Sequence, residues 1–121
     1  MNNNTAAHNG SRVGIERHKD AAVVVLHGEH DVDTVAAVRD QITDARVGDG
    51  VIVVDLTATT FIDSTVLAVL LNAYWADIPP RLRFIAPAET PPRRLFDFVG
   101  LDMAVPIFER LPDALAYKEL A

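Results

Sequence analysis

One stretch constrains the fold more than any other: an apolar run that ends in Asp55-Leu56 and leads, through a polar segment, into a second apolar run. The first run is Val-Ile-Val-Val at residues 51–54, and the second begins directly after Asp63-Ser64-Thr65. Four β-branched residues in a row are typical of a strand covered on both faces. Asp, Ser and Thr are residues whose side-chain oxygens cap the free N–H groups of a starting helix. The stretch therefore predicts a buried strand, a loop and a capped helix.

The rest of the chain alternates between strand and helix patterns. Strands are predicted at residues 12–19, 22–27, 51–55, 81–86 and 104–108, and helices at residues 33–45 including the cap, 64–76, 91–99 and 112–120. This alternation predicts one α/β domain, with a mixed, mostly parallel sheet of about five strands and about four helices packed on it. The domain is expected to span residues 12–121, and the polar, Asn-rich residues 1–11 are expected to form a disordered tail.

Composition limits the functions that such a domain can have. The chain has 121 residues, of which 50% are hydrophobic, and this suits one domain with a real core. Its net charge of -6 argues against nucleic-acid and anionic-membrane partners. The sequence contains no Cys and no apolar stretch of the roughly 20 residues that a membrane span needs. We therefore expect a soluble cytoplasmic protein.

Ser64 is the main candidate for a functional side chain. A helix start stabilises added negative charge, so the position suits a phosphorylated serine. A phosphate adds about -1.5 to -2 charges, and it would face Asp63 and the nearby Asp31 and Asp33. These carboxylates make the added charge unfavourable, which predicts a surface that binds a partner only when it is neutral. A plain helix cap, formed by Asp63 or Ser64, remains the alternative at this point.

Two further surfaces are candidates for binding a partner. Glu29, Asp31 and Asp33 form an acidic turn after a strand, and parallel topology places the carboxyl ends of strands along one edge of the sheet. The turn can therefore lie near Ser64, or it can be a solvated turn with a cap at Asp33. In the following helix, Val66 and Val69 lie off the inward stripe, which consists of Leu67, Leu70, Leu71 and Tyr74. Either a partner or a neighbouring helix covers these two valines.

An enzyme is the alternative from a different class. A small hydrolase would use Ser64 with Asp31 or Asp63, but the chain lacks the G-x-S-x-G motif. Its histidines lie in the tail, on an edge strand and around one turn (His8, His18, His27 and His30). His27 and Glu29 lack an evident third metal ligand, and no Gly-rich phosphate loop is present. We expect no metal and no cofactor, and we expect Arg93 and Arg94 to lie on a solvated helix face.

The segment FIDSTVLAVLL, preceded by VIVVDL, resembles the signature of STAS domains, and more narrowly that of bacterial anti-sigma factor antagonists. The upstream HGEHD resembles the Gly-Glu-apolar-Asp turn of that family, and LPDALA resembles its closing helix. The resemblance covers about residues 12 to 119. It implies a STAS fold and a protein that acts as a ligand and substrate, not as an enzyme.

The resemblance also implies roles for single residues. Ser64 matches the serine that a partner anti-sigma kinase phosphorylates and that a serine phosphatase restores. Asp63 matches the acidic residue before it, and Asp31 matches the acidic neighbour of the site. The unphosphorylated form then binds the anti-sigma factor and frees the sigma factor. The surface expected to contact the partner comprises Glu29, Asp31, Thr65, Val66 and Val69, in a protein that is a monomer or a weak dimer.

Three positions depart from the family pattern. Thr65 replaces a second serine, Val66 replaces a glycine, and His30 replaces an apolar residue in the acidic turn. The Val66 methyl groups would hinder a kinase that needs close approach to the backbone. A STAS scaffold that binds its partner without control by phosphate is therefore the second hypothesis.

Overall fold

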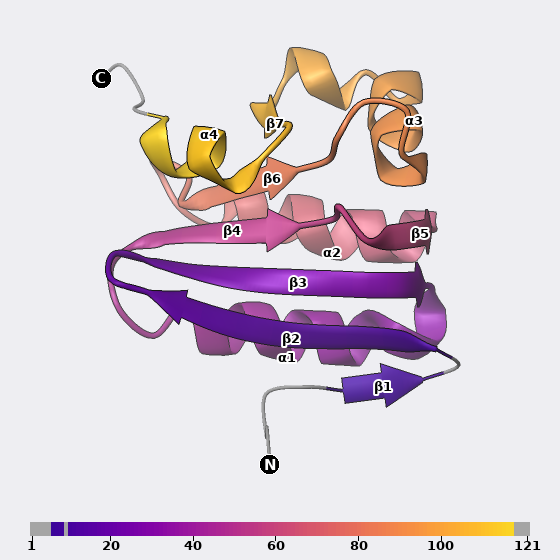
Figure 1. The fold of residues 1–121 in the computed structure, drawn as a ribbon, viewed down its shortest axis with the longest axis horizontal. Coiled ribbons are helices and arrows are strands. Elements are labelled where there is room, and N and C mark those ends of the chain that lie inside the picture. Colours follow the sequence, from indigo (N-terminus) through magenta and orange to yellow (C-terminus); the bar gives the residue numbers. More distant parts are fainter. Residues whose placement is uncertain (1–5, 9, 118–121) are drawn as a thin grey trace.

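A sheet of seven strands forms the centre of the molecule in the computed structural model, which describes residues 6–8 and 10–117 (Figure 1). The strands are β1 (Ala6–His8), β2 (Ser11–His18), β3 (Ala21–His30), β4 (Val51–Asp55), β5 (Thr59–Ile62), β6 (Leu82–Ile85) and β7 (Ile107–Phe108). Six of them follow the order β1-β2-β3-β4-β6-β7, and β5 pairs with the end of β3. The pairs β1–β2 and β2–β3 are antiparallel and the other pairs are parallel. The predicted mixed, mostly parallel sheet is confirmed.

Helices cover both faces of this sheet. They are α1 (Val35–Ala45), α2 (Ser64–Trp75), α3 (Pro91–Phe98) and α4 (Leu111–Ala116), with short 3-10 helices η1 (Val32–Thr34) and η2 (Leu101–Met103). In Figure 1, α1 and α2 lie behind the sheet and α4 lies in front of it. None of the described helices combines the length and apolarity needed to cross a membrane.

The apolar strands divide their side chains between two cores. Val24 and Val54 belong to the larger core, which includes the buried apolar residues of α1 and α2. Val23 and Val53 belong to a smaller core that Ala114 of α4 completes. Alternate residues of a strand point to opposite faces, so a strand with helices on both sides needs apolar residues at every position. This explains why the sequence reads as continuous valine runs.

Two strands were not predicted. Residues 6–8 were assigned to a disordered tail, but Ala6–His8 pairs with β2, while residues 1–5 and 9 lie outside the described part. β5 was read as part of a polar loop. Its Thr59 is buried, and the Thr59 hydroxyl donates to the carbonyl of Leu26 at 2.7 Å, so a polar residue occupies an interior position. The closing helix ends at Ala116, and residues 118–120 of its predicted span lie outside the described part.

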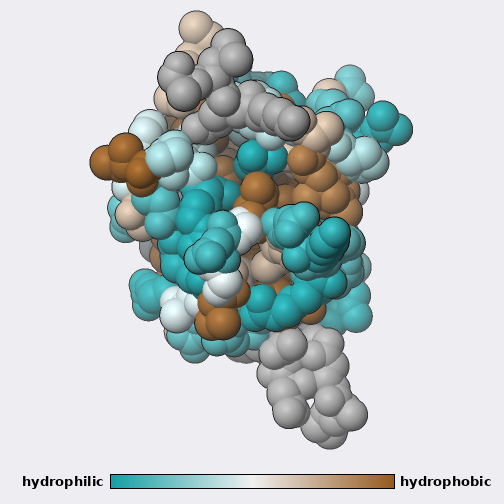
Figure 2. All heavy atoms as spheres, turned by 90° about the vertical axis from the view of Figure 1, so that its left-hand side faces the viewer, coloured by the Kyte–Doolittle hydropathy of each residue, from teal (hydrophilic) through white to brown (hydrophobic). Residues whose placement is uncertain are grey.

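The two ends of the sheet differ in character. The carboxyl ends of β3, β4 and β6 lie at the right-hand side of Figure 1, where β5 and the start of α2 follow. The opposite end carries the β2–β3 turn and the α1–β4 loop, and Figure 2 shows that it is mostly hydrophilic. Here a Cβ atom at Gly50 would lie 2.2 Å from the carbonyl oxygen of Asp20, so the turn and the loop touch through their backbones. The functional residues predicted from the sequence belong to the first end.

Candidate functional site

Asp63, and not Ser64, caps α2. Its carboxylate accepts hydrogen bonds from the N–H groups of Thr65 at 3.0 Å and Val66 at 3.1 Å, and from the Thr65 hydroxyl at 2.6 Å. Asp63 has the extended backbone of an N-cap residue, because β5 runs directly into it. Ser64 follows as the first helical residue, and its side chain is exposed. The plain-cap alternative therefore applies to Asp63 and leaves the Ser64 hydroxyl without a capping role.

The same hydrogen bonds keep Asp63 ionised. Partial burial on its own raises the pKa of the Asp63 carboxyl. The hydrogen bonds from the Thr65 hydroxyl and from the Val66 and Thr65 N–H groups outweigh that effect and hold the pKa below its ordinary value. A carboxylate thus lies next to Ser64 at neutral pH.

The structure brings the acidic turn beside the start of α2. The Asp63 N–H donates to the carbonyl of His30 at 3.2 Å, which joins the last residue of β3 to the cap of α2. Asp31 follows His30 and caps η1 by accepting the Asp33 N–H at 2.9 Å. Glu29 is exposed and lies opposite Phe61 in the β3–β5 pairing. The carboxylates of the turn and of Asp63 therefore gather at the edge that carries Ser64.

Of the residues expected to contact a partner, Val66 is a correction. Its side chain is 0% exposed and belongs to the larger core. Val66, Leu70 and Tyr74 are spaced by four residues, so they form one buried stripe along α2, whereas Leu71 is only half-buried. Thr65 is exposed, and Val69 is half-buried in a groove of about 260 Å³ between α1 and α2.

Two exposed apolar residues at this edge escaped the sequence analysis. Phe61 of β5 is 45% exposed, two residues before the cap of α2, and Val32 of η1 is 66% exposed between Asp31 and Asp33. In the sequence Phe61 stands beside another apolar residue, Ile62, so no alternation marks Phe61 as exposed. The preceding Thr-Ala-Thr-Thr segment resembled a loop, and this hid the short strand. Apolar side chains therefore accompany the carboxylates around Ser64.

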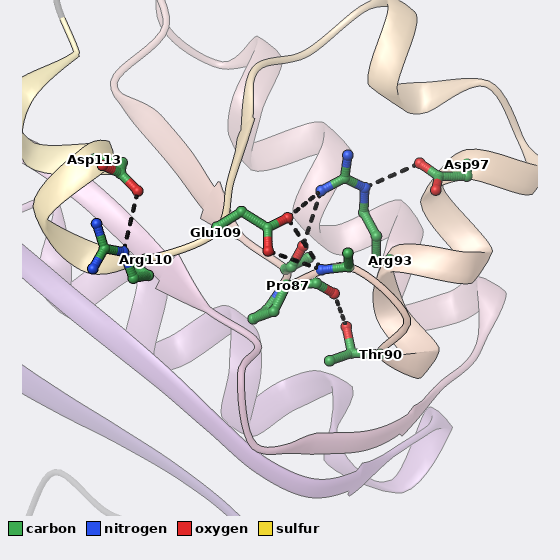
Figure 3. Close-up of polar contacts among 9 residues, drawn as sticks. Pro87, Thr90, Arg93, Asp97, Glu109, Arg110 and Asp113 are labelled. Carbon is green, nitrogen blue, oxygen red and sulfur yellow. Dashed lines mark hydrogen bonds and ion pairs between the residues drawn. The ribbon is translucent and has the colours of Figure 1, made fainter.

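A network around Arg93 fixes the loop between β6 and α3 (Figure 3). The Arg93 guanidinium donates to Glu109 at 3.2 Å, to Asp97 at 3.1 Å and to the carbonyl of Ala86 at 3.2 Å. Both Glu109 carboxylate oxygens accept the N–H of Ala88 at 3.1 Å. Arg93 was expected on a solvated face, and this expectation is wrong because the side chain is held between α3 and the segment after β7.

The ring of His30 is not placed as a base for Ser64. The ring of His30 is buried, with Nε2 3.1 Å from the His27 carbonyl and Nδ1 3.1 Å from the Thr34 hydroxyl. Both ring nitrogens thus have partners other than Ser64. Within the part of the chain that the structure describes, no three His, Asp or Glu side chains group as metal ligands.

The molecule is a single-domain α/β protein in which an antiparallel hairpin is joined to parallel strands. An exposed serine stands at the capped start of the helix behind these strands. The chain belongs to the STAS domain family. Residues 13–108 match the family model described as "Mlab, STAS domain", so the resemblance inferred from the sequence is confirmed. No curated protein sequence matches the chain significantly.

Solved structures share this fold. An anti-sigma factor antagonist from Mycobacterium paratuberculosis has a TM-score of 0.79 and 28% sequence identity, over 91% of this chain and 95% of that one. The anti-sigma factor antagonist SpoIIAA in its unphosphorylated form has a TM-score of 0.62 at 20% identity, over 84% and 91% of the two chains. Phosphorylated SpoIIAA from Bacillus has a TM-score of 0.58 at 23% identity, over 78% and 89%.

Proposed function

We propose that the protein is an anti-sigma factor antagonist that binds an anti-sigma factor kinase while Ser64 is unphosphorylated and releases it once Ser64 carries a phosphate. The observation that supports this most directly is the exposed Ser64 side chain, placed beside the ionised cap Asp63. The similarity to antagonists of anti-sigma factors, one of them 28% identical, supports the same role.

The switch is electrostatic. On the partner, the terminal phosphorus of ATP forms a bond to the Ser64 oxygen as its bond to the bridging oxygen breaks and ADP leaves, and the hydroxyl proton goes to a base of the kinase. The product adds about two negative charges next to Asp63 and the acidic turn, where each like-charge pair about 4 Å apart costs roughly 1–4 kcal/mol between the bulk-water and protein-surface limits. The partner must then lie against a strongly charged patch, and it leaves. A phosphatase that adds water to the phosphorus restores the neutral surface.

The second hypothesis, a STAS scaffold that binds its partner without control by phosphate, was based on the bulk of Val66 at a position where glycine was expected. Because the Val66 side chain lies in the core, it presents no methyl group beside the Ser64 hydroxyl. The bulk at this position is therefore no argument against a kinase, and phosphate control is the better supported of the two hypotheses.

A pull-down from extracts of the source cell, with and without ATP, tests the proposal. The wild-type protein should capture a kinase-type anti-sigma factor and should gain one phosphate on Ser64 when ATP is present. Ser64→Ala should stay unmodified and keep the partner, and Thr65→Ala, the matched control at the next hydroxyl, should still be modified. Ser64→Glu should weaken binding at least about tenfold, or about 1.4 kcal/mol, relative to Ser64→Gln. Equal phosphorylation of wild type and Ser64→Ala would contradict the site, and equal affinities of the Glu and Gln variants would contradict the charge mechanism.

A further inference from the structure

His30 is a buried polar side chain placed between the two elements of the site. It is 0% exposed and is the last residue of β3. Its carbonyl accepts the N–H of Asp63, the cap of the Ser64 helix. Its ring contacts the hydroxyl of Thr34 in η1, the short helix that Asp31 caps. One residue thus joins the acidic turn to the start of α2.

The hydrogen bonds of this ring can accommodate a second proton. Because a carbonyl only accepts, Nε2 carries a hydrogen toward the His27 carbonyl. In the neutral ring Nδ1 is then an acceptor, so the Thr34 hydroxyl must point toward it and away from the Asp31 carbonyl 3.2 Å away. In the charged ring Nδ1 donates to Thr34, whose hydrogen then serves the Asp31 carbonyl. Only the protonated ring supplies a hydrogen to all three contacts.

Burial, hydrogen bonds and nearby charges together decide which form of His30 prevails. Titratable residues stand on each neighbouring element: Arg12 on β2, His27 and Glu29 on β3, Asp31 and Asp33 at η1, and Asp63 at the start of α2. Burial lowers the pKa of His30, and it outweighs the hydrogen bonds to the His27 and Arg12 backbones and the Asp31 charge, which act in the opposite direction. The unmodified protein therefore keeps this ring neutral at neutral pH. Additional negative charge at Ser64 opposes the effect of burial.

We propose that His30 is a proton-binding site coupled to the charge on Ser64: phosphate at Ser64 favours protonation of His30, and protonation of His30 favours the phosphorylated state. The proposal rests on the proposed function for the identity of that charge. Its physical basis is reciprocal linkage, because two groups that attract each other raise each other's occupancy by the same factor. Mildly acidic conditions then stabilise the phosphorylated, released form, and the His30 ring confers this pH dependence.

The coupling can be measured without any partner. Imidazole NMR signals of the full-length protein are followed through a pH titration in Ser64→Glu and in the matched neutral variant Ser64→Gln. The titration midpoint of His30 should lie at higher pH in Ser64→Glu than in Ser64→Gln. Identical His30 midpoints in the two variants, or a ring that stays neutral in both down to acid unfolding, would overturn the proposal.

A second measurement guards against local distortion. Thermal unfolding of the same two variants is compared at pH 7.5 and 5.5, with His30 present and in the His30→Leu background that restores an apolar residue. Ser64→Glu should unfold at a lower temperature than Ser64→Gln. This difference in unfolding temperature should decrease from pH 7.5 to 5.5, and the decrease should be larger with His30 than with Leu at position 30. Equal shrinkage in both backgrounds would assign the effect to carboxylates and overturn the role of His30. A failed kinase assay would leave both measurements valid, so the two proposals fail separately.

Discussion

The hydroxyl of Thr65 donates a 2.6 Å hydrogen bond to the carboxylate of Asp63, two residues earlier in the chain. Ser64, which stands between them, has an exposed side chain and no part in that cap. Two adjacent alcohols are thereby distinguished, since one is committed to holding the helix start and the other faces solvent. This difference makes Ser64 the acceptor in the proposed switch and Thr65 its control.

Replacing the cap should destabilise the domain in a pH-dependent way. Asp63→Ala removes the acceptor for two N–H groups and should lower the free energy of unfolding by about 1 kcal/mol at pH 7. The folded-state pKa of Asp63 is depressed, so its stabilisation is present above the unfolded-state pKa and is lost as the pH falls through the folded-state value. Urea unfolding at neutral and acidic pH measures this. The stability difference between wild type and variant should narrow in acid, and a constant difference would contradict the carboxylate's role.

Restoring the family glycine should harm the fold without improving the switch. Val66→Gly leaves a cavity under α2 and adds the backbone entropy of glycine, so it should cost about 2–4 kcal/mol of stability. Ala68→Gly, at an exposed position of the same helix, should cost only about 1 kcal/mol. Chemical denaturation compares the two variants. A marked rise in phosphorylation rate in Val66→Gly would show that Val66 impairs the native site.

The exposed ring of Phe61 should contribute to partner binding. Phe61→Ala should reduce the affinity for the anti-sigma factor about tenfold or more, because buried aromatic rings at interfaces carry a large share of binding free energy. Val47→Ala, also exposed but at the opposite end of the molecule, is the control and should leave the affinity unchanged. Isothermal titration calorimetry with the purified partner measures the affinity of each variant. If Phe61→Ala lowers the affinity no more than Val47→Ala does, the interface lies elsewhere.

The two neighbouring arginines of α3 should behave differently. Arg93→Ala removes donors to Glu109, Asp97 and a backbone carbonyl, and should lower stability by about 1–2 kcal/mol. Arg94→Ala, whose side chain is exposed, should change it by less than about 0.5 kcal/mol. Thermal or denaturant unfolding of the pair provides the measurement, and matched losses would mean that the network in Figure 3 contributes nothing measurable.

The hydrophobic periodicity and the residues that begin and end helices were enough to predict the main helices and strands. The valine runs, the cap before Ser64 and the proline and glycine that bound α3 each act locally, so the sequence alone reveals them. β5 was missed because its first residues are threonines, and the hydroxyl of Thr59 is satisfied by a strand distant in sequence. Val66 was misplaced because a helix apolar over most of its surface does not indicate which side faces the sheet.

Only part of the candidate site could be predicted from the sequence, because some of its contacts join segments that are distant in the chain. The proximity of Ser64, Asp63 and the acidic turn could be predicted because they follow strands whose carboxyl ends share one edge. Arg93 could not, because its partner Glu109 lies on another segment and only the tertiary fold brings them together. The burial of His30 likewise depends on η1 folding back over the end of β3.

The placement of every proposed switch residue at one end of the sheet has a practical consequence. The α1–β4 loop at the other end contains Gly48, where a Cβ atom would meet nothing within 4 Å, while Gly50, two residues later, admits no side chain. A fluorescent reporter inserted after Gly48 would therefore lie at the opposite end of the sheet from Ser64. It should leave both phosphorylation of Ser64 and release of the partner unchanged. Such a fusion would let the switch be followed in living cells by a tag that the partner never touches.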